Sequence, residues 1–221
     1  QRIEGDDSQY ADDEGSGLTR DSLIDQPFSS DFTLASLVVR KDSGAIRFRS
    51  TTGASWQDVD ENFDASLDDL VRQLGQHSKA RALSNETRVW RPMADGYSWL
   101  IGFSSIAQRY EVSRDLTEEG QTADLSGVEN RVRETTVYGE VGVELLPRVE
   151  ASVGARYTIS ALRGSGGHLS PLAFAKLAEE DPKRTERRLL PSAALLARPF
   201  DGLTLYARYQ QGFRPGGLSI A

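Results

Sequence analysis

The sequence contains no cysteine and only two histidines among its 221 residues. Without thiols, disulfide bonds and thiolate metal sites are excluded. No run of about eighteen apolar residues is present, which excludes a membrane-spanning helix, and the first residues lack the basic and apolar regions of a signal peptide. The net charge of -7 argues against a nucleic-acid partner, because neutralising phosphates requires a surplus of lysine and arginine.

Catalytic motifs are also missing. The two imidazoles, His77 and His168, lie far apart in the sequence. The serines and carboxylates show neither a nucleophile elbow nor a metal-binding helix motif. We therefore expect no enzyme activity and no cofactor.

The chain does contain long stretches in which apolar and polar residues alternate. The clearest covers residues 135–160, where Val137, Val141 and Val143 share one parity and Val153 continues it after Pro147. A period of two is typical of a β-strand with one apolar face. The other parity carries charged residues at mid-strand, which a membrane barrel tolerates because its lumen is wet. We predict two long strands joined by a tight turn.

Three similar hairpins are predicted over residues 31–56, 80–112 and 187–213, with turns at 41–44, 92–96 and 199–202. The sequences between the hairpins are polar. We expect loops at 57–79, 117–130 and 164–183, with short helices near Ser66 to Gly75 and after Ser170. Residues 1–30 are rich in acidic residues and predict an extracellular acidic loop.

Taken together, the pattern predicts an all-β antiparallel meander of about eight long strands. Short turns at one end and longer connections at the other are the layout of outer-membrane barrels. In such a barrel Trp56 would lie near a membrane interface, where aromatic girdles form.

Several segments resemble TonB-dependent outer-membrane receptors. The sequence YARYQQGFRPGG at 206–217 is similar to a strand motif of that family, and residues 138–158 are similar to a hairpin that ends in "GlRyt". Residues 84–88, SNETR, are a weaker match. The resemblance spans most of residues 31–221 and implies an arc of a large transmembrane β-barrel of about twenty-two strands.

The family resemblance also implies a function. It places the chain in the outer membrane of a Gram-negative bacterium, in contact with lipid, as part of a receptor that imports a scarce ligand such as a ferric siderophore. TonB would act through a plug domain that is absent from this chain, so the expected polypeptide is a fragment of the barrel. The ligand itself is an unknown small molecule.

Five residues are candidates for ligand contact. In family terms the histidines His77 and His168 would contact iron or haem from external loops, although solvated histidines are commoner. The lumen-parity arginines Arg156, Arg208 and Arg214 would attract an anionic ligand, brace the plug or remain solvated.

Two other readings stay open at this point. Eight strands are enough to close a small barrel that serves as an anchor, adhesin or channel. A soluble carbohydrate-binding β-sandwich would instead pack its apolar faces on each other, and it would need more Leu, Ile and Phe than these faces contain.

The fragment interpretation makes a geometric prediction. The sheet should curve, and both of its edge strands should be open or paired with material outside the chain. The convex face should carry the apolar parity and the concave face the polar one. The convex set is Val137, Val141, Val143, Val153, Leu203 and Leu205, and the concave set is Glu140, Glu144, Arg156, Tyr206 and Arg208.

Overall fold

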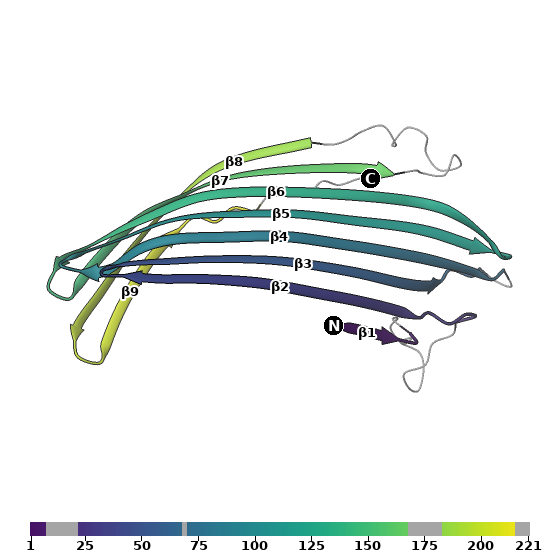
Figure 1. Cartoon of the computed structure of the whole chain (residues 1–221), viewed down its shortest axis with the longest axis horizontal. Helices are drawn as coiled ribbons and strands as arrows, with labels where there is room; N and C mark the ends of the chain where they lie inside the picture. The colour runs from purple at the N-terminus through teal and green to yellow at the C-terminus, as the bar shows by residue number, and fades with distance from the viewer. Residues whose placement is uncertain (8–21, 68–69, 168–182, 215–221) are drawn as a thin grey trace.

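The computed structural model describes residues 1–7, 22–67, 70–167 and 183–214, and these form one antiparallel sheet (Figure 1). Its nine strands pair strictly in chain order. They are β1 (Arg2–Gly5), β2 (Phe28–Ser43), β3 (Ile46–Asp64), β4 (Arg72–Ala94), β5 (Tyr97–Glu118), β6 (Gln121–Leu146), β7 (Val149–Gly167), β8 (Lys183–Phe200) and β9 (Leu203–Gln210). The predicted all-β meander is therefore confirmed, with the short β1 added to eight longer strands.

The sheet is curved and open. In the part of the chain that the structure describes, β1 and β9 are the two edges and do not pair with each other. Figure 1 shows β8 and β9 curving round at the turn end of the sheet. The alternative of a closed eight-stranded barrel is therefore wrong, because closure would require hydrogen bonds between the first and last strands.

Among the residues that the structure describes, no second layer packs against the sheet. Within the described ranges, Leu162 is the one buried hydrophobic side chain. The apolar parity lies at the surface instead, with Val141 and Leu205 each 54% exposed. The sandwich alternative is therefore wrong as well. Across the described residues, no helix has the length and apolar character needed to cross a membrane.

Register shows that the two faces differ as predicted. Val141 pairs directly with Trp99 and Val153, so these side chains share the apolar face. On the other face, Glu140, Arg156 and Arg208 line one hollow. Because that hollow also reaches β4 and β9, the polar face is the concave one and the apolar face is convex.

Strands replace the connections predicted at 57–79 and 117–130. β3 runs to Asp64 and β4 begins at Arg72, while β5 and β6 reverse direction through Glu119 and Gly120. Residues 164–167 likewise belong to β7, and the helix predicted after Ser170 lies outside the described residues. The sequence pattern of these stretches is typical of loops, because polar residues fall on both parities. Their backbone groups are nevertheless paired in the sheet.

The helix predicted from Ser66 is wrong for a local reason. The Ser66 hydroxyl does not cap a helix; it accepts a hydrogen bond from the Arg72 backbone N-H at 3.1 Å. Leu67 and Leu70 exchange backbone hydrogen bonds across the end of the hairpin. Hydrogen bonding from the Ser66 side chain, followed by its backbone N-H, lowers the pKa of Asp64 to about 2. Asp64 and Ser66 thus help to close a hairpin.

The strands are longer than a membrane crossing requires. β4, β5 and β6 contain 23, 22 and 26 residues, whereas about ten tilted residues cross a bilayer. On the convex face of β5 the series from Tyr97 to Ala107 is apolar except for Ser105. Ten residue steps of about 3.3 Å, on a strand tilted by roughly 40° from the barrel axis, cover about 25 Å along that axis. This is the height of the apolar band of outer-membrane β-barrels. The remainder of each long strand projects beyond that band.

The apolar face also contains a small polar group. The Ser50 and Thr87 hydroxyls lie 2.8 Å apart, and the Asn85 amide donates to Thr52 Oγ1 at 2.8 Å. These cross-strand hydrogen bonds satisfy polar atoms that would be costly to leave unpaired in an apolar environment.

In the acidic segment, Arg2–Gly5 forms strand β1, which pairs with the beginning of β2. Residues 8–21 lie outside the described part.

Candidate functional site

A line of arginines crosses the concave face. Arg40 on β2 pairs with Arg49 on β3, which pairs with Arg88 on β4. The same row continues through β5 and β6 to Arg156 on β7. Antiparallel pairing therefore gathers guanidinium groups that lie far apart in the sequence.

Tyr138 on β6 links the two halves of this row. Its neighbour on β5 is Gly102, and a Cβ atom at that position would lie 2.2 Å from Tyr138 Cζ. The ring thus occupies the space that the glycine leaves free. The Tyr138 hydroxyl donates to Glu86 Oε1 at 2.6 Å, and the Arg156 guanidinium lies 5.2 Å from the ring centroid.

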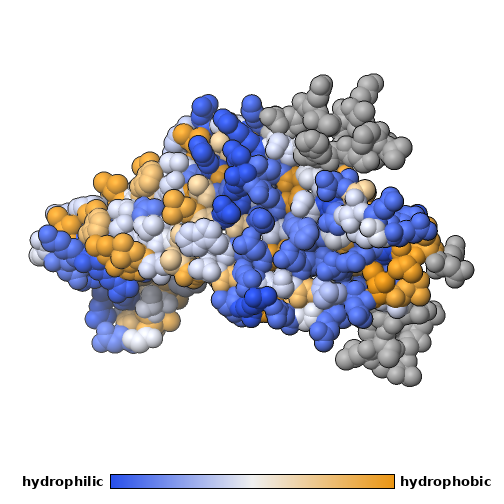
Figure 2. Space-filling model, turned by 45° about the vertical axis from the view of Figure 1, so that its right-hand side comes forward, coloured by the Kyte–Doolittle hydropathy of each residue, from blue (hydrophilic) through white to orange (hydrophobic). Residues whose placement is uncertain are grey.

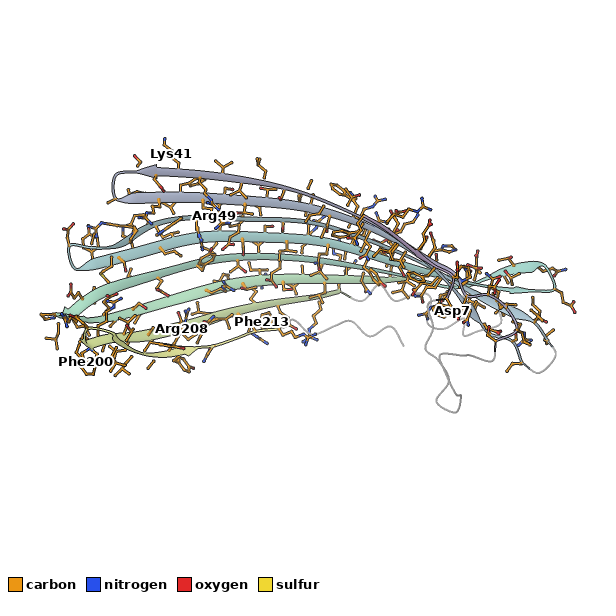
Figure 3. All side chains as sticks on the ribbon, turned by 90° about the horizontal axis from the view of Figure 1, so that it is seen from below. Asp7, Lys41, Arg49, Phe200, Arg208 and Phe213 are labelled. Carbon is orange, nitrogen blue, oxygen red and sulfur yellow. The ribbon has the colours of Figure 1, made fainter. Side chains whose placement is uncertain are left out.

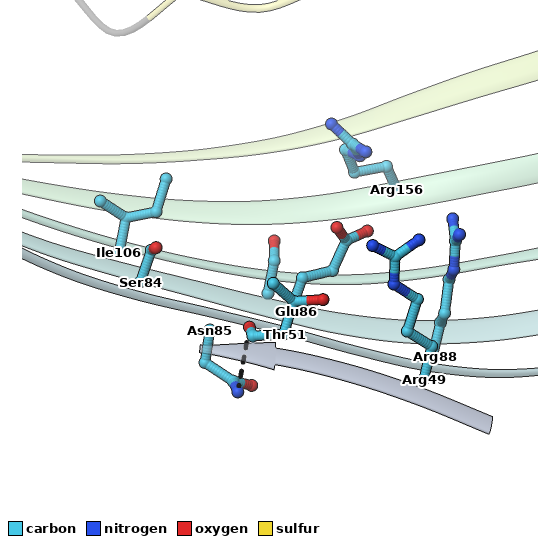
Figure 4. Close-up of a pocket in the computed structure, with 9 residues that line it drawn as sticks. Arg49, Thr51, Ser84, Asn85, Glu86, Arg88, Ile106 and Arg156 are labelled. Carbon is cyan, nitrogen blue, oxygen red and sulfur yellow. Dashed lines mark hydrogen bonds between the residues drawn. The ribbon is translucent and has the colours of Figure 1, made fainter. Parts of the chain in front are cut away.

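The first hollow on this face has a volume of about 450 Å³. Figure 4 shows its lining side chains, among them Arg49, Arg88, Arg156 and the carboxylate of Glu86. Arg49 Nε is buried and has no hydrogen-bond partner among the described residues. Three guanidinium groups therefore face one carboxylate that is already hydrogen-bonded to Tyr138.

A second hollow of about 510 Å³ lies beside the first and shares Arg88 and Arg156 with it. It adds Arg208 from β9, together with the carboxylates of Glu134 and Glu140. Figure 3 labels Arg49 and Arg208 on strands near opposite sides of the sheet.

The arrangement suits an anionic group better than a bare cation. Guanidinium groups recognise carboxylates and phosphates through paired hydrogen bonds, and several of them in one concavity raise the local concentration of anions. No group of three metal-ligating side chains occurs within the described ranges.

The structure brings together only some of the candidates predicted from sequence. Arg156 and Arg208 line one hollow, whereas Arg214 follows β9 and is exposed. His77 lies on strand β4 and not in a loop; its Nδ1 is 2.5 Å from Asp60 Oδ1 and its Nε2 is 3.6 Å from Asp115. His168 lies outside the described residues.

His77 also belongs to the face opposite the arginines. Its neighbour Gln76 pairs with Arg114 and Glu61, which continue the concave parity, so His77 itself falls on the convex parity. It cannot share a ligand with Arg156.

Sequence reasoning missed Arg49 and Arg88. Both lie on the polar parity of their own strands, and this parity is the sequence signal that could have identified them as lumen-facing. Their proximity to Arg156 depends on the pairing of β3 through β7, which no single strand encodes.

Comparison with known proteins identifies the fold. The family model described as "TonB dependent receptor-like, beta-barrel" matches residues 3–220. The chain belongs to this family. TonB-dependent receptors are non-enzymatic transporters of the outer membrane, so this barrel segment lies in that membrane, with its convex face toward lipid.

Solved receptors show the same architecture at low sequence identity. The ferric yersiniabactin uptake receptor FyuA from Yersinia pestis is 15% identical, with a TM-score of 0.68 over 90% of this chain and 30% of its own. The ferric citrate transporter FecA in the unliganded form is 12% identical, with a TM-score of 0.65 over 84% and 28%. The open form of the ferric-catecholate import receptor Fiu from E. coli K12 is 12% identical, with a TM-score of 0.60 over 92% and 39%.

The chain thus spans about 30% of the length of the first two receptors. Identities this low establish the shared fold alone. No curated protein matches the sequence.

Proposed function

We propose that this segment forms part of the wall of an importer whose lumen receives an anionic ligand, with ferric siderophores as the first class to test. The observation that carries the proposal is the convergence of Arg49, Arg88 and Arg156 on one concave hollow. The matched receptors named for ferric yersiniabactin, ferric citrate and ferric catecholate support the choice of ferric chelates.

The chemistry of the hollow fits a ligand with several carboxylate or catecholate oxygens. Each guanidinium presents planar donors to such oxygens, and the buried Arg49 Nε is a donor that the described part of the chain leaves unpaired. Glu86 accepts from Tyr138 through Oε1, and the three arginines of the hollow outnumber this one carboxylate.

In the complete receptor, import would be driven by TonB through a plug domain, and the ligand would descend past the lumen wall. Residues 1–30, which include β1 and the first residues of β2, would form an extracellular acidic segment, and residues 31–221 would hold the rest of the barrel strands. The position of β1 supports this, because it pairs with the beginning of β2, at the end of the sheet opposite the turn at residues 44–45.

The test uses the full-length receptor that contains this segment. A strain lacking it would be supplied with each of a panel of ferric chelates as sole iron source, and the chelate that restores growth would then be used in binding measurements. Arg88→Gln with Arg156→Gln removes the two arginines common to both hollows. We expect the affinity for that chelate to fall about tenfold or more, because each hydrogen bond to a charged group contributes about 1.5–3 kcal/mol.

The matched control is Arg133→Gln with Arg187→Gln, which removes two exposed arginines of the convex parity. This control should leave affinity unchanged. If the lumen variant binds the chelate as tightly as the control, the arginines brace the plug or are merely solvated, and their assignment to ligand binding is wrong.

A further inference from the structure

A second row of cations crosses the opposite, convex face. Arg81 on β4 pairs directly with Arg109 on β5, Arg109 with Arg131 on β6, Arg131 with Arg163 on β7, and Arg163 with Lys183 on β8. We call these five residues the outer basic row. All five side chains are exposed. The row extends across five consecutive strands.

The outer basic row marks the end of the apolar band. On β5, Arg109 directly follows the apolar series that ends at Ala107 on the same face. Figure 2 shows this change as orange and pale side chains toward the left give way to a blue zone across the middle. Trp56 extends the row onto β3, where it pairs with Arg81. An indole beside cations is typical of a membrane interface.

The row lies toward the outside of the cell. Outer-membrane barrels have short periplasmic turns and project their longer segments outward. The four turns at residues 44–45, 95–96, 147–148 and 201–202 lie at the opposite end of the sheet. The row therefore meets the outer leaflet at the depth of its headgroups.

Five cations in direct register repel one another, and the protein neutralises only some of them. Glu111 forms an ion pair with Arg109, and Glu129 forms ion pairs with both Arg109 and Arg131. In the part of the chain that the structure describes, Arg81, Arg163 and Lys183 have no carboxylate within ion-pair distance. Like charges placed opposite each other destabilise a sheet unless a counter-charge is present.

The row also encloses a site of suitable size. Arg131, Arg163 and Lys183 line a hollow of about 200 Å³ on three neighbouring strands, with Glu129 at its edge. A tetrahedral anion can approach all three cations there, and basic side chains between membrane-facing strands or helices bind lipid headgroups by the same chemistry.

We propose that the outer basic row binds the phosphate groups of an outer-leaflet lipid. The lipid tails would lie along the apolar band formed by Val137, Tyr157 and Leu189, which are consecutive neighbours on β6, β7 and β8. The headgroup would meet Arg131, Arg163 and Lys183. On β7 the tail-facing surface continues from Tyr157 through Ile159 and Ala161 to Arg163, and this continuity selects a lipid over a free anion. On β6 and β8, Arg133 and Arg187 lie on the same face just before the row and add two further cations.

The test uses the full-length receptor extracted in a mild detergent. Bound phosphorylated lipid would be quantified by mass spectrometry for the native protein and for Arg131→Gln/Arg163→Gln/Lys183→Gln. We expect the variant to retain several-fold less. The matched control is Arg40→Gln/Lys41→Gln/Arg47→Gln, which removes three cations at the turn end of β2 and β3 and should retain the native amount.

Further arms separate a lipid from a free anion. After delipidation, the protein would be offered a phosphorylated glycolipid, the same lipid without phosphate, or inorganic phosphate. Rebinding of the phosphorylated lipid alone supports the proposal. Equal retention by the triple variant and its control overturns it, as does equal occupancy by inorganic phosphate.

A second variant and a second measurement keep the lipid proposal testable. If the triple variant fails to assemble, Arg163→Gln/Lys183→Gln removes only the two cations of the hollow that have no ion-pair partner among the described residues, and it should still lower lipid retention. Chelate affinity should be unchanged in either variant, because the row lies on the face opposite the lumen arginines. Failure of this proposal is therefore distinguishable from failure of the import proposal.

Discussion

At the scale of single residues, close packing between strands depends on where side chains are absent. Tyr138 lies across Gly102 and reaches Glu86 two strands away, and Glu86 lines the same hollow as Arg88 and Arg156. An aromatic ring over a glycine fills the gap in a sheet and fixes the local register. The position of the arginine hollow thus depends on a residue that has no side chain.

We predict that Gly102→Ala displaces the Tyr138 ring. The new Cβ would clash with Cζ, so the hydrogen bond to Glu86 should break, at a cost of about 1–3 kcal/mol. The midpoint of thermal unfolding, measured for the full receptor in detergent, should fall. Gly166→Ala is the control, because a Cβ there meets nothing within 4 Å.

A double-substitution cycle sharpens this prediction. In a Tyr138→Ala background the clash no longer exists, so Gly102→Ala should add little further loss. Equal destabilisation in both backgrounds would show that the glycine acts through its backbone and not through the ring.

At the scale of elements, tight turns allow the strands to continue well beyond the membrane. Glu119 and Gly120 join β5 to β6 with φ values of 51° and 78°, and Asp95 and Gly96 join β4 to β5 with 51° and 80°. Two successive positive φ angles are typical of the type I′ turn, which matches the twist of paired strands. Glutamate is an unusual residue at such a position, and aspartate or asparagine is commoner.

We predict that Glu119→Val loosens the outer tip of the β5–β6 hairpin, whereas Glu119→Asn tightens it. A left-handed conformation costs a β-branched residue about 1–2 kcal/mol, and asparagine less. Amide hydrogen exchange over residues 113–127 should become faster in the valine variant and slower in the asparagine variant.

Gln121→Val is the matched control for the turn. Gln121 opens β6 beside the turn and is not among the residues with positive φ, so valine there should leave exchange nearly unchanged. Identical exchange in the Glu119 and Gln121 valine variants would remove turn strain as the explanation.

At the scale of the whole molecule, the sheet separates a lipid-facing surface from a lumen-facing one. The three tryptophans are distributed over both surfaces. Trp99 belongs to the convex apolar band, Trp56 lies beside Arg81 of the outer basic row, and Trp90 pairs with Leu100 on the concave parity.

We predict that brominated lipids distinguish these tryptophans by face and depth. In the reconstituted full receptor, Trp99→Phe should remove fluorescence that lipid bromine quenches, and Trp90→Phe should remove fluorescence that it does not quench. Trp56→Phe should remove a component that responds mainly to bromine near the headgroups. Similar quenching of Trp90 and Trp99 would contradict the assignment of the two faces.

The sequence by itself determined the strands that cross the apolar band. Within that band, lipid on one side and water on the other force alternation, so Val137, Val141 and Val153 reveal their common face without any tertiary information. The glycine-containing turns and the motif at 206–217 likewise indicated the meander and the family. Each of these signals is local.

Only the tertiary structure decided the features that depend on pairing between strands. Beyond the apolar band both faces meet water, alternation disappears, and residues 57–64 and 121–130 are held in strands by pairing with their neighbours, which no periodicity of their own announces. The cations of both rows are likewise distant in the sequence, and a register shift of one residue would move them to opposite faces. The arginine hollow and the outer basic row therefore exist because of register, which composition and periodicity do not encode.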